Sequence, residues 1–538
     1  MMGVLRRVGD MLAGLSGWRR SAVLVAAGAI STMAFAPFHQ FWVLWFSFAV
    51  LMVLLDRSVS GRQAFFTGFW FGYGQFIAGL YWITSAFLVD AAAFAWLIPL
   101  PLLGLPAVLA VFVALPCFLS WRLSSGPGIV RLLMFAACWT LGELARGYMF
   151  TGFPWNLMGY ATGVHVAAMQ PVAWVGIYTL SFLVVLAAGG IGLLIPLTAG
   201  QNTRRRTVPA LLFSFGIPVL IVISGALRLQ PAFTPDDAPV VRVVQANIPQ
   251  AEKWAAEFVN GNFLEQVRMS DAPGNSVTGR PDIVIWPETA ATFYLSHDQQ
   301  RLAQLQALAG RLSPRGVVIT GALHAEPVGN RARPDIYNAA YAVTGRTSIP
   351  PAIYAKQHLV PFGEYLPFRP VLSLIGLKAI AETRGDFSSG SNPQMLEFDG
   401  LPAARVLICY EAIFPEEVAL GDTTDRPRWL INLTNDAWFG ALTGPYQHFD
   451  MARFRAVEQG APMVRAAGTG ISGLIDPYGR IVAYIGLEEK GTADFKLPTR
   501  LDRAPLPSGI NLVLLATLLI VVAAGALASR LFVQRDNY

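Results

Sequence analysis

The chain has 538 residues, of which 54% are hydrophobic and only 14% are charged, with a mean hydropathy of +0.47. These values exclude a soluble globular protein of ordinary composition, in which about 25% of the residues are charged, and the 12% aromatic content excludes a disordered chain. Three cysteines are too few for a disulfide framework, and the net charge of +6 lies in small arginine groups beside apolar segments, not on a nucleic-acid-binding face. The sequence therefore predicts a membrane protein.

Apolar stretches follow one another from Ser21 to Leu227, most of them near the ~20 residues that a bilayer-spanning helix needs. We predict seven transmembrane helices in this part of the chain and an eighth near its end. Their approximate ranges are 21–38, 41–55, 63–88, 92–120, 130–149, 170–197, 208–227 and 509–529. Four prolines, at positions 99, 101, 106 and 116, interrupt the fourth of these ranges.

The basic residues predict how these helices are oriented, because Lys and Arg are retained on the cytoplasmic side of a membrane. Arginines lie before the first predicted helix and after the second, fourth, sixth and eighth, whereas the opposite short connections carry almost none, with Arg146 as the main exception. We therefore expect both termini in the cytoplasm. The predicted organisation is a membrane domain (1–231), a domain in the periplasm outside a bacterial inner membrane (232–506), and a C-terminal helix with a cytoplasmic tail (507–538).

Residues 232–506 have the character of a soluble domain in which short apolar strands alternate with helix-like segments. The strand candidates are PVVRVVQANI (239–248), PDIVIWPETA (281–290), GVVITGAL (316–323), ARVLICYEAI (404–413), WLINLTNDAWF (429–439) and PMVRAAGTG (462–470). Helical patterns lie near 255–270, 299–312 and 446–460. This alternation predicts an α/β or layered α+β domain.

Cys409 ends one of these apolar strands and is the only cysteine between residues 232 and 506. It therefore has no partner for a disulfide inside that domain. A buried, inert thiol and a reactive nucleophile are both compatible with this position. Cys117 and Cys138 instead fall inside predicted transmembrane helices, where free cysteine commonly behaves as a small hydrophobic residue.

Two charged residues follow apolar strands elsewhere in the same domain. Glu288 ends the segment PDIVIWPE, where partial desolvation would make its carboxylate a better base. Lys356 lies in the segment YAKQHLVPFGEYLP, where an ammonium could favour a thiolate and stabilise an oxyanion. Taken singly, each residue fits a structural role better, as a carboxylate that caps a turn or an ammonium on a solvated surface.

The three residues together are more specific than any one of them. WPE, YAKxHLVPFGEY and ICYE, in this order and at the ends of separate strands, resemble the Glu-Lys-Cys triad of the nitrilase superfamily. Set between several N-terminal transmembrane helices and one C-terminal helix, the domain is similar to that of the bacterial apolipoprotein N-acyltransferase family, and the resemblance extends over essentially the whole chain. Other motifs that resemble this family are QANIPQAEKW (245–254), GFPWNLMGY (152–160), NLTNDAWFG (432–440) and QHFDMARFRAVE (447–458).

The resemblance implies a periplasmic nitrilase-like αββα sandwich domain attached to a multi-span α-helical membrane domain. It also implies a ping-pong acyltransferase whose donor is a membrane phospholipid, typically phosphatidylethanolamine, and whose acceptor is the amino group of the diacylglyceryl-cysteine that begins an apolipoprotein. By this resemblance Glu288 is the base, Lys356 stabilises the oxyanion and Cys409 carries the acyl chain as a thioester. No cofactor is implied, and we expect a monomer.

Four residues near the triad resemble supporting positions of the family. Glu364 and Glu411 would be supporting acids, with Glu411 expected to orient Lys356. Tyr410 would offer a backbone N–H or pack against the acyl chain, and Trp254 would lie at the mouth of the pocket. The structural alternative for each residue is turn capping, plain packing or a position that faces solvent.

Two features concern contact with lipid. Glu143 and Arg146 share a face of the fifth predicted transmembrane helix, where they would either brace the scaffold, which we favour, or bind a lipid headgroup as substrate-binding residues. The segment 366–380 is too apolar for an exposed loop and too short to span a bilayer. It predicts either an arm that touches the membrane or a buried helix.

Two other functions would explain fewer features of the sequence. A membrane-anchored carbon-nitrogen hydrolase (amidase) would use the same triad with water, but eight transmembrane helices are more than anchoring requires. A transporter with a soluble receptor domain would leave the triad unused and would need more paired charges inside the membrane.

The six histidines show no metal-binding spacing, so no metal site is expected. A base role for His358 would make the glutamate and the lysine redundant.

Overall fold

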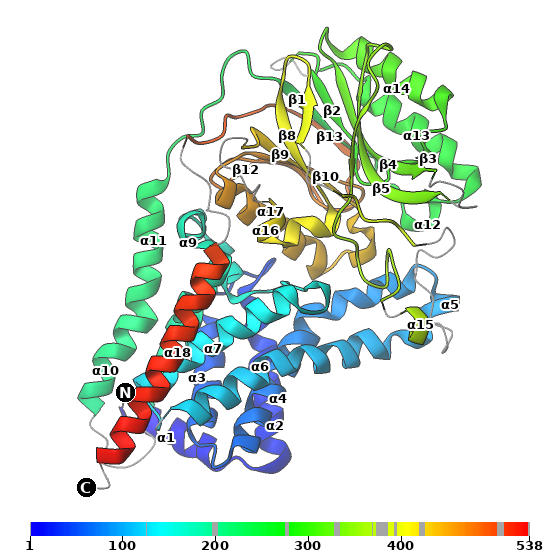
Figure 1. Ribbon diagram of the computed structural model, residues 1–538. Helices are drawn as coiled ribbons and strands as arrows, with labels where there is room; N and C mark the ends of the chain where they lie inside the picture. Colours follow the sequence, from blue (N-terminus) through cyan, green and yellow to red (C-terminus); the bar gives the residue numbers. More distant parts are fainter. Residues whose placement is uncertain are drawn as a thin grey trace. The chain divides into compact units, whose positions relative to one another are not determined.

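The computed structural model divides the chain into two compact units, drawn in Figure 1. The helical unit comprises Met1–Leu229 and Gly509–Tyr538, and the sandwich unit comprises Gln230–Ser508. The residues that the structure describes are 2–124, 126–195, 203–274, 279–327, 334–367, 369–372, 386–391, 395–418, 426–502 and 510–535.

The helical unit consists of largely apolar helices with short connections. Its α-helices are α1 (Met2–Ala13), α2 (Gly17–Ser31), α3 (Val43–Asp56), α4 (Gly61–Leu80), α5 (Ala91–Phe94), α6 (Leu105–Leu123), α7 (Ile129–Tyr148), α8 (Val166–Met169), α9 (Val172–Gly190), α10 (Thr203–Leu211), α11 (Ile217–Arg228) and α18 (Ile510–Arg535). Each of the eight predicted transmembrane ranges overlaps at least one of these helices. Helices suit a bilayer because their backbone groups are hydrogen-bonded within the segment.

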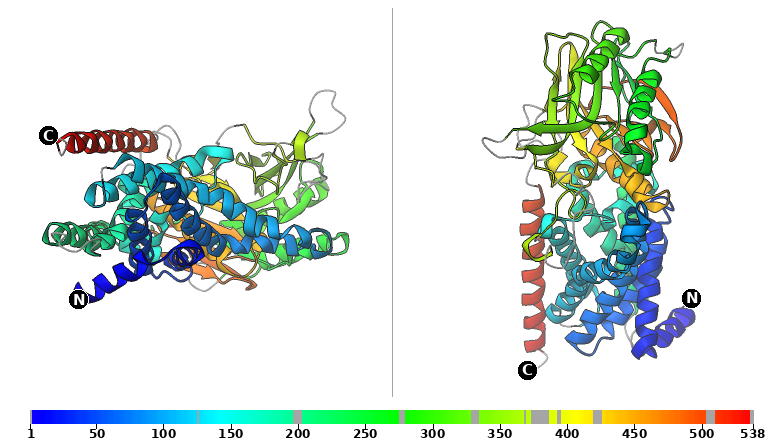
Figure 2. Two further views of the ribbon diagram at one scale, coloured as in Figure 1. Left: turned by 90° about the horizontal axis from the view of Figure 1, so that it is seen from below. Right: turned by 90° about the vertical axis from the view of Figure 1, so that its right-hand side faces the viewer.

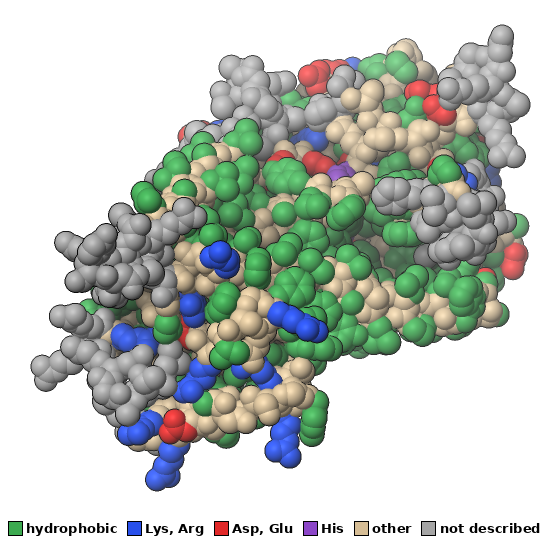
Figure 3. All heavy atoms as spheres, turned by 60° about the horizontal axis from the view of Figure 1, so that its bottom comes forward, with side chains coloured by type: hydrophobic (Ala, Val, Ile, Leu, Met, Phe, Trp, Pro, Cys, Tyr) green, Lys and Arg blue, Asp and Glu red, His purple; other side chains and the backbone are tan. Residues whose placement is uncertain are grey.

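Among the described residues, three helical stretches are long and apolar enough to cross a membrane: Ala91–Leu123, Val172–Leu194 and Arg206–Arg228. Val43–Asp56 and Asn511–Leu527 are shorter apolar helices. Figure 3 shows hydrophobic side chains over much of the visible surface of this unit, with basic side chains gathered toward one end. The fold is therefore that of a multi-span helical membrane domain.

The proline-rich stretch remains helical, although its geometry changes along its length. A π-helical turn, Leu100–Gly104, separates the short α5 region from α6. Pro99 and Pro101 cannot donate backbone hydrogen bonds, and a wider turn accommodates them without ending the helix. Pro106 is the second residue of α6 and directly follows this wider turn. The prolines therefore change the helical geometry within one continuous stretch, Ala91–Leu123.

Glycines allow two of the apolar helices to pack closely. A Cβ atom on Gly28 of α2 would lie 1.9 Å from the carbonyl oxygen of Phe71 in α4, and one on Gly74 of α4 would lie 2.0 Å from that of Val25 in α2. Small residues give this advantage to membrane helices because association there depends on close van der Waals contact.

The sandwich unit contains two β-sheets. Its strands are β1 (Val240–Gln245), β2 (Ile283–Ile285), β3 (Ala291–Tyr294), β4 (Val317–Glu326), β5 (Asp335–Thr344), β6 (Ala352–Ala355), β7 (Met395–Phe398), β8 (Leu401–Ile408), β9 (Trp429–Thr434), β10 (Met463–Ala467), β11 (Ser472–Ile475), β12 (Ile481–Ile485) and β13 (Gly491–Lys496). The first sheet has the order β13-β1-β2-β4-β5-β6, with β3 beside β4, and the second has the order β12-β11-β10-β9-β8-β7.

Helices cover the outer face of each sheet, as Figure 1 and the right-hand view of Figure 2 show. Helices α13 (Ala256–Ser270) and α14 (Gln299–Leu312) pack on the first sheet, and α17 (Thr443–Gln459) packs on the second. The short helices are α12 (Gln250–Lys253), α15 (Arg369–Leu372) and α16 (Pro415–Val418). One apolar core, with members such as Ile285 and Val406, lies between the sheets. The predicted αββα sandwich is therefore present.

The centre of each sheet is parallel. β1, β2 and β4 pair in parallel in the first sheet, and β8, β9 and β10 do so in the second. Because parallel strands in such a sandwich are covered on both faces, they have nearly continuous apolar sequences, which is why all six predicted strands are found here. The carboxyl ends of parallel neighbours lie at the same edge of the sheet.

Candidate active site

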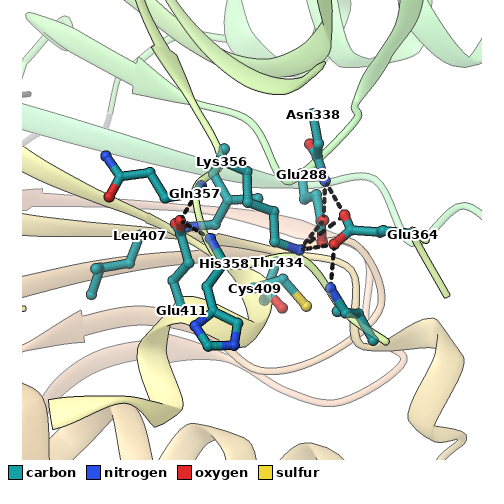
Figure 4. Close-up of polar contacts among 12 residues, drawn as sticks. Glu288, Asn338, Lys356, Gln357, His358, Glu364, Leu407, Cys409, Glu411 and Thr434 are labelled. Carbon is teal, nitrogen blue, oxygen red and sulfur yellow. Dashed lines mark hydrogen bonds and ion pairs between the residues drawn. The ribbon is translucent and has the colours of Figure 1, made fainter. Parts of the chain in front are cut away.

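Glu288, Lys356 and Cys409 all lie just beyond the ends of strands. Glu288 follows β2, Lys356 directly follows β6, and Cys409 directly follows β8. Because β2 and β6 belong to the first sheet and β8 to the second, the site combines side chains from both sheets. Figure 4 shows the three side chains converging, although more than 50 residues separate each from the next along the chain.

The turn that carries Glu288 depends on a glycine in the neighbouring strand. A Cβ atom on Gly321 of β4 would lie 2.4 Å from the nitrogen of Thr289 and 2.6 Å from Cα of Glu288. The Gly321 N–H instead donates a hydrogen bond of 3.1 Å to the carbonyl oxygen of Pro287. A side chain at position 321 would therefore displace the carboxylate.

Two carboxylates hold the Lys356 ammonium. Its Nζ lies 2.9 Å from Oε2 of Glu364 and 3.8 Å from Oε1 of Glu288. Nδ2 of Asn338 donates to both carboxylates, at 2.7 Å to Oε1 of Glu288 and 3.0 Å to Oε1 of Glu364. The Val360 N–H donates to Oε2 of Glu364 at 2.8 Å. Lys356 is only 1% exposed, so its charge is fixed in place by these partners (Figure 4).

The electrostatics of the site favour a neutral thiol at Cys409 and a charged ammonium at Lys356. Burial raises the pKa of the Cys409 thiol and Glu288 raises it further, whereas Lys356 lowers it. Burial alone would lower the pKa of Lys356, but Glu364, Glu288 and Cys409 outweigh burial, so the pKa is raised above its ordinary value. A thiol in this environment needs a base to remove its proton, and the adjacent permanent cation stabilises the negative charge that results.

The backbone at Cys409 makes a strained turn that Glu411 holds. Cys409 has φ of 51°, in the left-handed region that non-glycine residues rarely adopt. Oε2 of Glu411 accepts a hydrogen bond of 2.6 Å from the Ile408 N–H, and Oε1 accepts one of 2.7 Å from the Gln357 N–H. The Tyr354 hydroxyl donates to the same Oε1 at 2.9 Å. Glu411 thus joins the turn after β8 to the end of β6.

The predicted role of Glu411 differs from what the contacts show. The sequence predicts that Glu411 orients Lys356, but the direct partner of the ammonium is Glu364. Glu411 bonds to the backbone beside Lys356, because its own side chain is buried under the turn at Cys409. Burial accordingly raises the pKa of the Glu411 carboxyl group.

Lys253 is a second buried ammonium in the site, and its role is not evident from the sequence pattern. Its Nζ donates a hydrogen bond of 2.9 Å to the backbone carbonyl of Glu288. Burial lowers the pKa of Lys253 to about 8, although Glu288 and Cys409 oppose this effect. Lys253 also lines a cavity of about 20 Å³ with Glu288 and Asn435, which is about the space that one water molecule needs. The only sequence signal was its place beside Trp254 in the family-like motif 245–254.

Tyr410 and His358 pack against one another beside the turn at Cys409. Tyr410 is buried, with its ring centroid 5.0 Å from that of Phe414 and 5.5 Å from that of His358. His358 stacks on Phe414 at 3.9 Å and its Nδ1 contacts Glu417. The His358 ring is therefore engaged in packing and an acidic contact. Trp254 directly follows α12 and is partly buried.

Glu143 and Arg146 belong to α7 in the helical unit, where both are buried. Arg146 donates hydrogen bonds of 2.6 Å and 2.7 Å to the carbonyl oxygens of Phe153 and Trp155. Oε1 of Glu143 accepts from the Met158 N–H at 2.9 Å. The two charges thus brace the motif 152–160. The cavity beside them is about 10 Å³, which is too small for a lipid headgroup.

The predicted apolar arm, 366–380, is described only in part. Leu366 is buried, and α15 (Arg369–Leu372) is a single helical turn. Residues 368 and 373–380 of the predicted arm lie outside the described residues.

Comparison with known proteins covers both units. The sequence profile described as the apolipoprotein N-acyltransferase N-terminal domain matches residues 27–190, and that of carbon-nitrogen hydrolase matches residues 240–501. The carbon-nitrogen hydrolase profile describes the nitrilase-like domain whose Glu-Lys-Cys triad the motifs resemble. Because a nitrilase-like domain occurs here together with an acyltransferase-specific helical domain, the amidase alternative is not favoured.

Curated relatives extend over nearly the entire chain. An apolipoprotein N-acyltransferase from Rhodopseudomonas palustris is 41% identical over 92% of both chains, and one from Bradyrhizobium diazoefficiens is 40% identical over 90% of both. A third, from Brucella melitensis, is 37% identical over 97% of this chain and 98% of its own. The profile matches of the helical unit and of the nitrilase-like sandwich, together with these relatives, show that the chain belongs to the apolipoprotein N-acyltransferase family.

Proposed function

We propose that this enzyme transfers an acyl chain from a membrane phospholipid to the N-terminal amino group of a diacylglyceryl-cysteine on an apolipoprotein, through a thioester on Cys409. The observation that carries this proposal is the convergence of Glu288, Lys356 and Cys409. The helical unit supports it, because both substrates are lipids and the enzyme is a membrane protein. We assign residues 1–231 and 507–538 to the membrane part and 232–506 to catalysis.

In the first half-reaction Glu288 takes the proton of the Cys409 thiol, and the sulfur attacks the ester carbonyl of the phospholipid. Lys356 stabilises the oxyanion that forms, since its ammonium is fixed and shielded from water. The carbon–oxygen bond then breaks, the leaving alkoxide takes the proton from Glu288, and the acyl chain remains on the sulfur.

In the second half-reaction the neutral amino group of the apolipoprotein attacks the thioester carbonyl. Glu288 takes a proton from the attacking nitrogen and returns it to the leaving sulfur, so that the amide forms and the thiol is regenerated. A thioester suits this purpose because it is activated toward amines and can be shielded from water in a buried site.

Supporting roles follow from the contacts. Glu364 and Asn338 hold the triad charges, and Glu411 holds the turn at Cys409. We assign Tyr410 to packing near the acyl chain and Trp254 to the mouth of the pocket. Phosphatidylethanolamine is the proposed donor. The proposed enzyme is a monomer of the bacterial inner membrane with its catalytic domain in the periplasm and both termini in the cytoplasm.

Covalent labelling tests the central step. Purified enzyme is mixed with phospholipid that carries a labelled acyl chain, and bound label is measured after denaturation. The native enzyme should retain label as a hydroxylamine-sensitive thioester, whereas Cys409→Ala should retain none and Cys138→Ala should label like the native enzyme. Undiminished labelling of Cys409→Ala would overturn the assignment.

The acceptor is tested in a second reaction that contains enzyme, phospholipid and a diacylated lipopeptide. Mass spectrometry should show that the peptide gains one acyl chain at its amino terminus. A lipopeptide whose amino group is already acetylated serves as the control and should gain none. Release of free fatty acid without a gain in peptide mass would instead indicate a hydrolase.

A further inference from the structure

Thr434 lies beside the nucleophile because of strand register. β8 and β9 pair in parallel with Ile408 opposite Leu433, so Cys409, directly after β8, and Thr434, the last residue of β9, lie at the same edge of the sheet. Both side chains are buried, at 7% and 0% exposure. Figure 4 draws the two side chains beside one another, and Thr434 acts to lower the pKa of the thiol.

The Thr434 hydroxyl has a single proton and two possible acceptors. In this structure Oγ1 of Thr434 donates a hydrogen bond of 2.8 Å to Oδ1 of Asp436. Rotation about the Cβ–Oγ1 bond would direct the same proton to the Cys409 sulfur. The hydroxyl can therefore serve either the carboxylate or a thiolate, but not both at full strength.

Asp436 is held independently of Thr434. Its Oδ2 accepts a hydrogen bond of 2.6 Å from Arg465, and Nδ1 of His448 lies 2.9 Å from its Oδ1. Burial would raise the pKa of Asp436, but Arg465 and His448 outweigh burial, so the pKa lies well below its ordinary value. Because these partners remain, Asp436 stays ionised and anchored when the hydroxyl turns away.

The same residues also hold the backbone of the nucleophile. Nε2 of His448 lies 3.2 Å from the carbonyl oxygen of Cys409. Arg465 additionally contacts Oδ1 of Asn432, two residues before Thr434 in β9. Asp436, His448 and Arg465 are each at most 1% exposed, and the three form a rigid support beneath the Cys409 turn. Because His448 acts on the backbone carbonyl of Cys409 and Arg465 acts on Asp436 and Asn432, we treat both as positioning residues.

We propose that Thr434 is a further catalytic residue, whose hydroxyl turns from Asp436 to the Cys409 sulfur and donates a hydrogen bond to the thiolate in both half-reactions. This inference rests on the proposed role of Cys409 as the nucleophile. The thiol proton still goes to Glu288, and Thr434 keeps its own proton, so no covalent bond at Thr434 forms or breaks. Hydrogen bonds to a charged group are stronger than neutral ones, so the thiolate can compete for the hydroxyl.

Alkylation of Cys409 by iodoacetamide tests this role without any lipid substrate. The rate is measured from pH 6 to 10 on the full-length enzyme in detergent, by mass spectrometry of the peptide that contains Cys409. The charged groups that act on the sulfur are Glu288, Lys356, Lys253 and Asp436. They are the same in every variant compared, so a shift between the profiles reports the hydroxyl.

Thr434→Val removes the hydroxyl and should slow alkylation about tenfold at pH 8, because one lost hydrogen bond to a charged group moves an equilibrium by roughly that factor. Thr434→Ser should stay within about twofold of the native rate, since it keeps the donor. Thr140→Val, at a buried threonine of α7 in the helical unit, is the control and should react like the native enzyme.

Native-like alkylation of Thr434→Val would overturn the inference. So would equally slow alkylation of Thr434→Ser, because packing rather than the donor would then be responsible. Failure of the proposed function has a different signature: Cys409 would show the hydroxyl-dependent profile, but the enzyme would take no labelled acyl chain from phospholipid.

Discussion

Asn338 donates a hydrogen bond of 2.7 Å to Oε1 of Glu288. The same Nδ2 lies 3.0 Å from Oε1 of Glu364, so one amide fixes the distance between the proposed base and the acid that holds Lys356. Asn338 comes from β5, whose sequence DIYNAAYAVT gave no indication of a role in the site.

Replacing Asn338 should therefore impair catalysis without removing a reacting group. In Asn338→Ala the two carboxylates lose their bridge, and misplacement of Glu288 should lower the rate of thioester formation about tenfold to a hundredfold. Single-turnover acylation by labelled phospholipid measures this rate. Asn260→Ala, on α13, is the control and should keep the native rate. A native rate in Asn338→Ala would show that the bridge is dispensable.

Removal of the Glu364 carboxylate should change the pH dependence of acylation. Glu364 contributes most to raising the pKa of Lys356 against burial, so Glu364→Gln should lower that pKa. The ammonium would then be lost at a lower pH, and the alkaline limb of the rate profile should move toward neutrality while rates at lower pH change less. Rates measured from pH 6 to 11 check the shift. A parallel loss at every pH would mean that Glu364 acts on something other than the Lys356 charge.

Lys253 should matter most below pH 8. Because burial lowers its pKa to about 8, the ammonium that favours the Cys409 thiolate is present below that pH and disappears above it. The ratio of native to Lys253→Met acylation rates should therefore be largest near pH 6.5 and fall as the pH rises past 8. Lys490→Met, at a lysine whose side chain is 51% exposed, should give a ratio near one throughout. A pH-independent ratio for Lys253→Met would assign the residue to packing alone.

The hydrogen bond between Tyr354 and Glu411 should contribute to the stability of the sandwich unit. Tyr354→Phe removes one of the donors to Glu411 and should lower the free energy of unfolding by about 1 kcal/mol. Chemical denaturation followed by tryptophan fluorescence measures the change. Tyr484→Phe, at a tyrosine that is 67% exposed, should leave stability unchanged. Equal stability of all three proteins would contradict the role assigned to this bond.

The contacts of Arg146 predict a structural effect rather than a substrate effect. Arg146→Lys keeps the charge but cannot reproduce the fork that reaches the carbonyl oxygens of Phe153 and Trp155. We expect a lower melting temperature with an unchanged KM for phospholipid. Arg122→Lys, at an exposed position near the end of α6, is the matched control. A raised KM with unchanged melting temperature would indicate headgroup binding.

The sequence predicted those parts of the fold whose patterns are local. Strands β1, β2, β4, β8, β9 and β10 have apolar runs because they are covered on both faces, and these runs predict them. Several other strands, β5 and β12 among them, are not predicted, since β5 carries polar residues into the site and β12 is an edge strand with exposed residues.

The site shows the same division between local pattern and spatial contact. Glu288, Lys356 and Cys409 could be located because each stands at the end of a strand within a motif that resembles a known family. The partnership of Lys356 with Glu364, the bridging Asn338 and the ammonium of Lys253 depend on which strands become neighbours in space. No spacing along the chain encodes that information.

The division of the reacting groups between two sheets makes the interior of the sandwich a determinant of turnover. Glu288 and Lys356 move with one sheet and Cys409 with the other, so the thickness of the apolar layer between them sets the distance from base to sulfur. Trimming a side chain such as Ile431 or Val464, remote from the sulfur in sequence, would let the layers settle closer together. Activity should then decline at temperatures where the protein is still folded.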